Sequence, residues 1–321
     1  MRRSAALAFA VVLSSAAPAQ HSALDGVQAA LEQGAADSAL SLLAGLPAAE
    51  ASSGEAHNLR CRVYLTLEQP DPAAAECEQA VRLDGKNSNY HLWLGRALGG
   101  KAEKASFLSA YSLAKRTREE FEQAVQLNPR NAEALADLGE FYSSAPGAVG
   151  GGMEKAGGVA DQLDRVDPAR AHELRARIAE DDKEYATAEH EFRAAVAASP
   201  HPAFQWMTLA SFFRRRQRWS DMTAAVTTGR AAAEKDRHAG AALCNGASVL
   251  ARAERNLDLA AQLLDEYLAG TVKTEEAPAF VAHVQRARIA AKLGDMATAK
   301  RERDAALALA SKYKPAQDLK F

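Results

Sequence analysis

The stretch FEQAVQLNPRNAEALADLGEFY, residues 121–142, decides the fold. An apolar face with three-residue spacing precedes Pro129 and one with four-residue spacing follows it, which predicts two helices joined by a break. The first face consists of Phe121, Ala124 and Leu127, and the second of Ala134, Leu138 and Tyr142. Because Ala124 and Gly139 are small, two helices can approach each other closely at these positions.

This order of residues resembles the tetratricopeptide repeat, in which an aromatic, a small residue and a proline close one helical hairpin, and a leucine, a glycine and an aromatic open the next. The resemblance implies an all-α fold, a right-handed superhelical α-solenoid of stacked antiparallel helix pairs. A single pair cannot bury its apolar face, so neighbouring pairs stack into a continuous core. The first helix of each pair is expected to line the concave side.

The same pattern divides the chain into repeats. We expect a single array over residues 20–321 that begins with a degenerate capping pair at 20–53. Seven repeats are expected near residues 54–87, 88–131, 132–168, 169–202, 203–240, 241–279 and 280–315. Two insertions interrupt them: a surplus around 99–115, expected to lengthen the second helix of its repeat, and the sequence SSAPGAVGGG at 143–152.

Residues 1–19 have the order of a cleavable signal peptide. Arg2 and Arg3 precede the apolar run 5–13, and the small residues at 17–19 supply a cleavage site. The run is shorter than the roughly 20 apolar residues that span a bilayer, so we expect no transmembrane span in the mature chain. No cysteine stands at the cleavage position, and nothing indicates a lipoprotein anchor. We therefore expect a periplasmic or secreted protein.

The chain contains three cysteines, at positions 61, 77 and 244. Cys61 and Cys77 are expected on facing sides of the two helices of one pair, and two alternatives remain open for them. They form a disulfide that closes a loop of about 15 residues, or they are two buried thiols. Cys244 has no partner in either case. Because no Cys-x-x-Cys or His-x-x-x-His cluster occurs, we predict no metal site and no cofactor.

Two further features could concern ligands. Histidines recur at one repeat position, and we interpret them as amphipathic residues that pack between successive pairs. These pairs lie roughly 20 Å apart, two helix packing distances, which is too far for a shared metal. They are His57, His91, His172 and His283. The glycine-rich loop 147–152 lacks the Lys-Ser/Thr of a phosphate-binding loop. We interpret it as an extended connection, the alternative being a loop that touches a ligand in the groove.

Charge and motifs argue against several classes of function. The 39 Lys and Arg nearly balance the 41 Asp and Glu, so we expect no nucleic-acid partner. The basic run 214–218 stands among aromatics that fit core positions, which favours a solvated or groove-facing basic turn over a nucleic-acid strip. No Ser-His-Asp, Cys-His or paired-carboxylate arrangement recurs, and we expect no enzymatic activity.

A partner-binding groove is predicted from the helical register of the carboxy-terminal repeats. If Leu209 and Phe213 face the core, the residues after them turn to the concave side, where basic residues stand in three successive repeats without acidic residues at the matching positions. The predicted groove residues are Phe204, Met207, Arg214, Arg215, Arg252, Arg288 and Lys292. Their unpaired charge is expected to bind an acidic or carboxylate-ended segment of a partner protein, because arginine matches a carboxylate with two parallel hydrogen bonds.

The resemblance implies that the protein is an interaction scaffold that holds a partner peptide or protein segment on its concave groove. One alternative is a structural accessory of a cell-envelope assembly that uses its convex face while the groove is empty or filled by the chain itself. A second alternative is a non-catalytic module that accompanies an enzyme. A polar, satisfied groove would favour the convex-face alternative, whereas unpaired charge in the groove favours partner binding.

Overall fold

The structure, a computed structural model, describes residues 23–236 and 238–321, so the expected signal peptide at 1–19 lies outside the described residues. The regular elements of these two segments are all helices, which confirms the all-α fold of antiparallel helix pairs. A short first pair is followed by seven longer ones. The pairs are α1 (Ala23–Glu32) with α2 (Ala36–Ala44), α4 (Gly54–Thr66) with α5 (Pro70–Leu83), α6 (Ser88–Lys104) with α7 (Phe107–Leu127), α8 (Ala132–Ser144) with α9 (Met153–Leu163), α10 (Pro168–Asp181) with α11 (Tyr185–Ala198), α12 (Pro202–Arg215) with α13 (Trp219–Ala233), α14 (Gly240–Ala253) with α15 (Leu257–Ala269), and α16 (Ala279–Lys292) with α17 (Met296–Leu309). Three short helices, α3 (Ala48–Ala51), η1 (Gly147–Val149) and α18 (Lys314–Gln317), lie outside this pairing.

Local sequence signals set where these helices begin and turn. Several first turns are capped by a side-chain oxygen that accepts a backbone N–H, as Asn131 does from Ala134 at 3.1 Å. The other caps of this kind are Ser53, Asn87, Asp167 and Asp295. Most turns within a pair contain a residue with positive φ, which reverses the chain tightly. These residues are Gly34, Glu68, Gly150, Gly152, Lys183, Gln217, Glu254, Asn256 and Gly294.

The joint predicted at residues 121–142 is built as its spacing implies. Phe121 and Tyr142 are buried, with 7% and 9% of their surface exposed, in a core shared by α6 to α10. A Cβ on Gly95 would lie 2.5 Å from the Phe121 ring, and one on Gly139 would overlap the Cδ2 atom of Leu174. The absence of a side chain at these two glycines therefore allows successive helices to touch.

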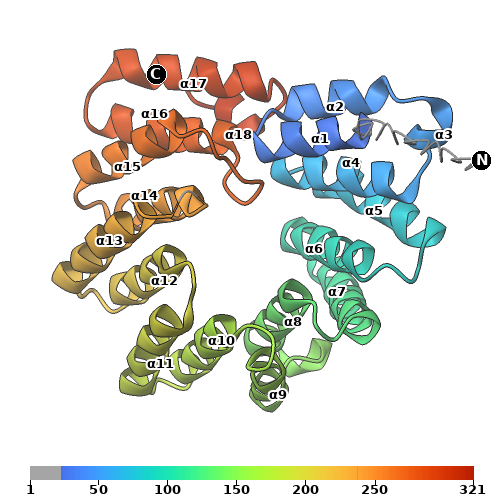
Figure 1. Cartoon of the computed structure of the whole chain (residues 1–321), viewed down its shortest axis with the longest axis horizontal. Coiled ribbons are helices and arrows are strands. Elements are labelled where there is room, and N and C mark those ends of the chain that lie inside the picture. The colour runs from blue at the N-terminus through green and yellow to red at the C-terminus, as the bar shows by residue number, and fades with distance from the viewer. Residues whose placement is uncertain (1–22, 237) are drawn as a thin grey trace, which may run out of the picture.

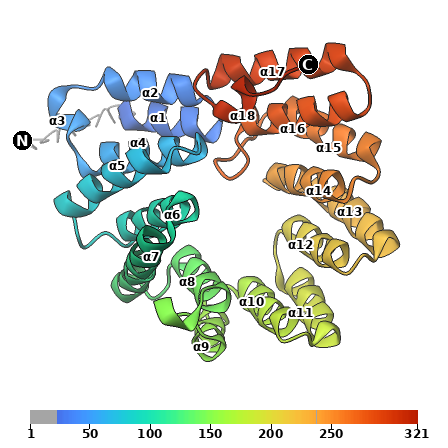
Figure 2. The same cartoon turned by 180° about the vertical axis from the view of Figure 1, so that it is seen from behind.

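The array closes into a ring, which the sequence analysis did not predict. In Figures 1 and 2, α16, α17 and α18 at the end of the chain lie beside α1, α2 and α4 at its beginning. One apolar core joins the two ends: Leu24, Val27 and Leu31 of α1 belong to the same buried cluster as Phe280 and Tyr313. We call this junction the seam. The protein is thus a solenoid whose two ends bury each other.

Polar contacts reinforce the seam. The Tyr313 hydroxyl donates to Glu68 Oε1 at 2.8 Å, and the Ser311 amide donates to an Asp37 carboxylate oxygen at 2.8 Å. These partners are separated by 245 and 274 residues in sequence. The first and last pairs are therefore held by hydrogen bonds as well as by apolar packing.

The two insertions pack on each other outside the regular repeat. The surplus around 99–115 lengthens both helices of its pair, since α6 has 17 residues and α7 has 21. Arg118 of α7 donates to the Val149 carbonyl at 3.2 Å, and the Tyr111 hydroxyl donates to the Ala148 carbonyl at 3.2 Å. The glycine-rich loop thus rests against α7. In the described part of the chain, no helix is both long and apolar enough to cross a membrane.

Candidate functional site

A cavity of about 450 Å³ opens on the inner side of the ring. Its wall comes mainly from first helices of the pairs, α8, α10, α12 and α14, as expected for the concave side of such an array. The lining residues are Ala136, Asp137, Glu140, Leu163, Arg170, Glu173, Leu174, Arg177, Phe204, Gln205, Thr208, Asn245 and Glu276. We call it the central cavity. Its size suits a few side chains of a peptide segment.

Most charges of the central cavity are already paired with each other. Arg177 bonds to Glu173 at 2.8 Å and to Glu140 at 3.4 Å. Burial disfavours the charged guanidinium, but these carboxylates outweigh the effect and raise the pKa of Arg177. By contrast, the amide oxygen of Gln205 is buried and has no hydrogen-bond partner among the described residues. The cavity is therefore lined by satisfied ion pairs and the ring of Phe204, and the Gln205 side chain in its wall keeps one buried acceptor without a partner.

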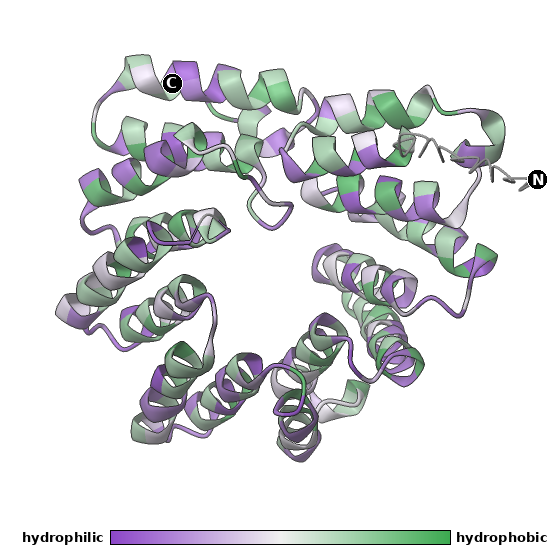
Figure 3. Cartoon of the chain, viewed as in Figure 1, coloured by the Kyte–Doolittle hydropathy of each residue, from purple (hydrophilic) through white to green (hydrophobic). Residues whose placement is uncertain are grey.

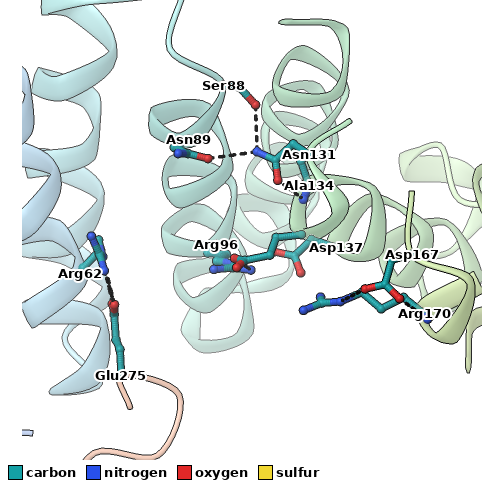
Figure 4. Close-up of polar contacts among 11 residues, drawn as sticks. Arg62, Ser88, Asn89, Arg96, Asn131, Ala134, Asp137, Asp167, Arg170 and Glu275 are labelled. Carbon is teal, nitrogen blue, oxygen red and sulfur yellow. Dashed lines mark hydrogen bonds and ion pairs between the residues drawn. The ribbon is translucent and has the colours of Figure 1, made fainter. Parts of the chain in front are cut away.

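The connection between α15 and α16, residues 270–278, projects into the ring (Figure 1), and its tip is hydrophilic (Figure 3). Figure 4 shows that Glu275 of this loop reaches Arg62 of α4, and the Arg62 Nε atom lies 3.1 Å from both carboxylate oxygens. The side chain of Arg62 is 16% exposed and that of Glu275 is 10% exposed. Burial raises the pKa of Glu275, and the positive charge of Arg62 opposes this rise. The chain thus places one of its own carboxylates on its concave side.

Arg62, which binds this loop, and Arg96 both lie over one aromatic ring. The Arg62 and Arg96 guanidinium carbons lie 5.1 and 4.5 Å from the centre of the Trp93 ring, which is cation–π geometry. Arg96 also bonds to Asp137 at 2.5 Å and to Glu133 at 3.0 Å. The groove prediction missed these residues. Arg62 and Arg96 stand one repeat of 34 residues apart, so their periodic spacing on first helices could have revealed them.

Phe204 and Met207, the two apolar residues of the predicted groove, have different environments. Phe204 lines the central cavity, where a ligand could contact it. Met207 has only 2% of its surface exposed, because it fills the space between Gly229 of α13 and Gly246 of α14. The prediction that Met207 is a groove contact is therefore wrong: its side chain belongs to the core.

The arginines at the end of α12 and α14 form one group. The pKa of Arg214 is lowered mainly by burial and, to a smaller extent, by the positive charges of Arg215 and Arg252. These two side chains are therefore close enough to repel that of Arg214. The Nε atom of Arg214 is buried without a hydrogen-bond partner among the described residues. Arg215 instead bonds to Glu180 of the preceding pair at 2.8 and 2.6 Å. The prediction of unpaired charge is wrong for Arg215, because its long side chain reaches across one repeat.

Arg288 and Lys292 of α16 lie apart from that group. Lys292 pairs with Glu254 at 2.5 Å, so the prediction of unpaired charge is wrong for it too. Arg288 lines a second cavity, at the seam. Within residues 23–236 and 238–321, neither Arg252 nor Arg288 has an ion-pair partner. The predicted basic strip is thus divided into the arginine group of α12 and α14 and a separate cation at the seam.

The three cysteines have two different environments. Cys61 of α4 and Cys77 of α5 form a disulfide with their Cα atoms 5.3 Å apart, so the disulfide alternative is the one that the structure contains. Cys244 is a buried free thiol, and burial raises its pKa to about 12. An unreactive thiol of this kind is a packing residue.

The four repeated histidines each bind a glutamate of the second helix in the same pair. Nδ1 to carboxylate distances are 2.6, 2.6, 2.6 and 2.7 Å. The pairs are His57–Glu76, His91–Glu120, His172–Glu191 and His283–Glu302. Among the described residues, no group of three or more His, Cys, Asp or Glu is arranged to hold a metal ion. The recurrent position is therefore a bridge within each pair, and the interpretation that these histidines pack between pairs is wrong.

No family model and no curated protein matches the chain. The solved structures that it resembles are tetratricopeptide-repeat proteins, as residues 121–142 predicted. A thermophilic repeat protein of Thermus thermophilus is 18% identical over 58% of this chain and 98% of its own, with a TM-score of 0.49. The C-terminal part of a repeat protein of Cytophaga hutchinsonii is 17% identical over 93% and 100%, with a TM-score of 0.42. The pilF protein of Pseudomonas aeruginosa is 16% identical over 83% and 95%, with a TM-score of 0.38.

Proposed function

We propose that the protein is an exported interaction scaffold that holds a segment of a partner protein on the inner side of its ring, at the central cavity. The fold itself suggests a protein–protein interaction scaffold. The observation that carries the proposal further is the buried, unpartnered amide oxygen of Gln205 in the wall of a cavity of about 450 Å³. A buried acceptor without a partner costs about 1–3 kcal/mol, and a backbone donor of the partner would recover it once the Gln205 amide turns toward the cavity.

The surroundings of Gln205 suit a peptide more than a small charged ligand. Phe204 supplies an apolar surface and Asn245 an exposed amide, while Arg177 and Glu173 neutralise each other beside them. A segment that binds here would gain backbone hydrogen bonds and apolar contact. We expect its affinity to depend less on salt than that of a purely ionic site.

Two observations support the export of the protein. Residues 1–19 have the order of a cleavable signal peptide. The Cys61–Cys77 disulfide is of the kind that persists in oxidising compartments such as the bacterial periplasm. We therefore propose a periplasmic or secreted location.

The test is to obstruct the central cavity. Thr208 and Asn245 both line it, and arginine at both positions would fill it. The matched control is Thr227→Arg with Gln262→Arg, because these residues are exposed on second helices and Thr227, like Thr208, donates its hydroxyl to the carbonyl four residues before it. Partners captured from envelope extract by the mature protein are identified, purified and titrated. We expect at least a tenfold loss of affinity in the cavity variant alone.

Equal binding by both variants would show that the partner does not use the central cavity. A second candidate function then applies, in which outward-facing elements contact the partner in an envelope assembly. It is favoured by the Glu275 loop, which already occupies part of the concave side, and by Phe107 and Leu108 at the tip of the α6–α7 pair, which are 86% and 82% exposed. Replacing both tip residues by serine would abolish binding in that case.

A further inference from the structure

A cavity of about 650 Å³ lies at the seam and is lined by residues from both ends of the chain. Its first half comes from the α4–α5 turn and the end of α6, and its second half from α16 and α18. The lining residues are Leu67, Glu68, Gln69, Lys104, Arg288, Lys312, Lys314, Pro315, Gln317 and Asp318. We call it the seam cavity. It exists only because the ring is closed.

The seam cavity is surrounded by an excess of positive charge. Four cations line it, Lys104, Arg288, Lys312 and Lys314, against two carboxylates. Arg288, Lys312 and Lys314 have no ion-pair partner in the part of the chain that the structure describes.

The remaining polar groups at the seam cavity leave this excess in place. The Glu68 carboxylate already accepts the Tyr313 hydroxyl at 2.8 Å, and Lys104 Nζ donates to the Glu68 carbonyl at 2.8 Å. One of the two carboxylates is therefore committed to the seam, and three cations remain free to bind an anionic ligand.

We propose that the seam cavity binds an acidic segment of a partner protein through several carboxylates at once. The cations come from separate elements around a wide opening, so they match charges spread along a peptide better than a single compact anion. One exposed ion pair contributes about 1 kcal/mol or less, so affinity requires several pairs together. Arginine can bind a carboxylate with two hydrogen bonds, and lysine acts as a point charge. This site is separate from the central cavity and does not depend on the function proposed for it.

Binding at this site is coupled to ring closure. A ligand that bridges α18 and the α4–α5 turn binds the closed ring and not a ring whose ends have separated, so it stabilises the closed form. Acidic segments should therefore raise the thermal midpoint of unfolding in a concentration-dependent way.

The experiment uses a fluorescent tetraglutamate peptide with a free carboxyl end, a tetraglutamine peptide, and inorganic phosphate as competitor. The seam variant is Arg288→Gln, Lys312→Gln and Lys314→Gln. The control variant, Lys86→Gln, Arg130→Gln and Lys235→Gln, has the same net charge, but its exposed residues stand in turns between pairs, at the opposite end of the helices from the α4–α5 turn. We expect at least a tenfold loss of tetraglutamate affinity, and loss of the thermal shift, in the seam variant alone.

Four outcomes would overturn the proposal. Equal losses in the two variants would indicate non-specific attraction, and unchanged affinity in the seam variant would place the peptide elsewhere. Phosphate that competes as well as tetraglutamate at equal concentration would indicate a small-anion site. The first three results leave the function proposed for the central cavity untested, because tetraglutamate is expected to bind at the seam. Obstructing the central cavity with Thr208→Arg and Asn245→Arg should therefore leave tetraglutamate binding unchanged. If that obstructed variant alone loses tetraglutamate binding, the seam proposal fails while the central cavity keeps its assigned role.

Discussion

The joint at residues 121–142 and the seam both bring helices of different pairs into contact, but they do so in different ways. At the joint, neighbours in sequence touch through small residues, and Gly139 lets Leu174 and Val159 approach its helix. At the seam, the large aromatic residues Phe280 and Tyr313 pack on each other with ring centres 4.8 Å apart and join the buried cluster of α1. Tyr313 also bonds to Glu68, 245 residues earlier. Both regions combine buried aromatic residues with a glycine that allows close approach, since a Cβ on Gly34 would overlap the Ala279 backbone across the seam. They differ in that the joint repeats a short-range pattern, whereas the contacts of the seam occur once in the chain.

The largest difference between the two regions should appear when a seam aromatic is removed. Phe280 is fully buried, and Phe280→Ala should lower the free energy of unfolding by about 3–5 kcal/mol and open the ring. The matched variant is Phe192→Ala, since Phe192 is 1% exposed and packs on Phe212 within the array. Urea unfolding should show similar losses, while small-angle scattering should show a larger radius of gyration for Phe280→Ala only. Identical scattering by the two variants would contradict a closed ring.

The disulfide should have the next largest effect, in the pair beside the seam. Cys61 and Cys77 are separated by 16 residues, and closing a loop of about 15 residues stabilises a protein by about 3 kcal/mol in the chain-entropy model. Reduction should lower the unfolding midpoint of the native protein and of Cys244→Ala but not that of Cys61→Ala with Cys77→Ala. Thiol counting in denaturant without reductant should give one thiol per chain; a count of three would rule out the bond.

A smaller effect is expected when the regular joint is overfilled. Gly139→Ala would place a methyl group against Leu174, which should cost about 1–3 kcal/mol. Gly157 of α9 provides the contrast, since a Cβ there would meet nothing within 4 Å. Gly157→Ala should stabilise the protein by about 0.5–1 kcal/mol through helix propensity. Chemical denaturation measures both, and destabilisation by the two variants alike would mean that close approach is not what glycine provides at position 139.

The smallest expected effect concerns pH and the pair next to the joint. The hydrogen bond that His91 donates to the Glu120 carboxylate raises the pKa of His91, and burial only partly offsets this rise. The folded protein thus holds the His91 proton more tightly than the unfolded chain does, so protonation of His91 stabilises the fold. This contribution to the free energy of unfolding is full below about pH 6.5, the ordinary histidine pKa. It disappears as pH rises through the higher pKa of the folded protein. His91→Gln should flatten this fall in the free energy of unfolding, measured by urea titration at several pH values. A variant profile parallel to that of the native protein would show that His91 does not carry it.

Sequence reasoning reached the parts of the fold that short-range spacing encodes. The apolar faces on either side of Pro129, together with the small residue Gly139, predict the joint because the contacting residues are close in the sequence. The seam could not be predicted in this way. Nothing in the spacing around Phe280 or Tyr313 specifies a partner in α1 or α4, since these contacts depend on how the curvature of all the pairs accumulates.

The candidate site was predicted less completely for a related reason. Helical register placed Phe204 on the inner side, where it lines the central cavity. It placed Arg288 in the same groove, but Arg288 lines the seam cavity instead. It did not detect that Arg215 and Lys292 reach back to Glu180 and Glu254, which stand 35 and 38 residues earlier. Comparing residues at matching repeat positions overlooks such partners, because a long side chain spans more than one position.

Ring closure also has a consequence for the order of events during folding. Contacts between residues 68 and 313 require a very long loop to close, and the repeats between them can stack pair by pair before that happens. The apolar face of α1, with Leu24, Val27 and Leu31, is synthesised first but receives Phe280 and Tyr313 only after the last pair has been made. The beginning of the chain therefore completes its folding last, and during this delay its apolar face is the part of the molecule most exposed to chaperones and to aggregation.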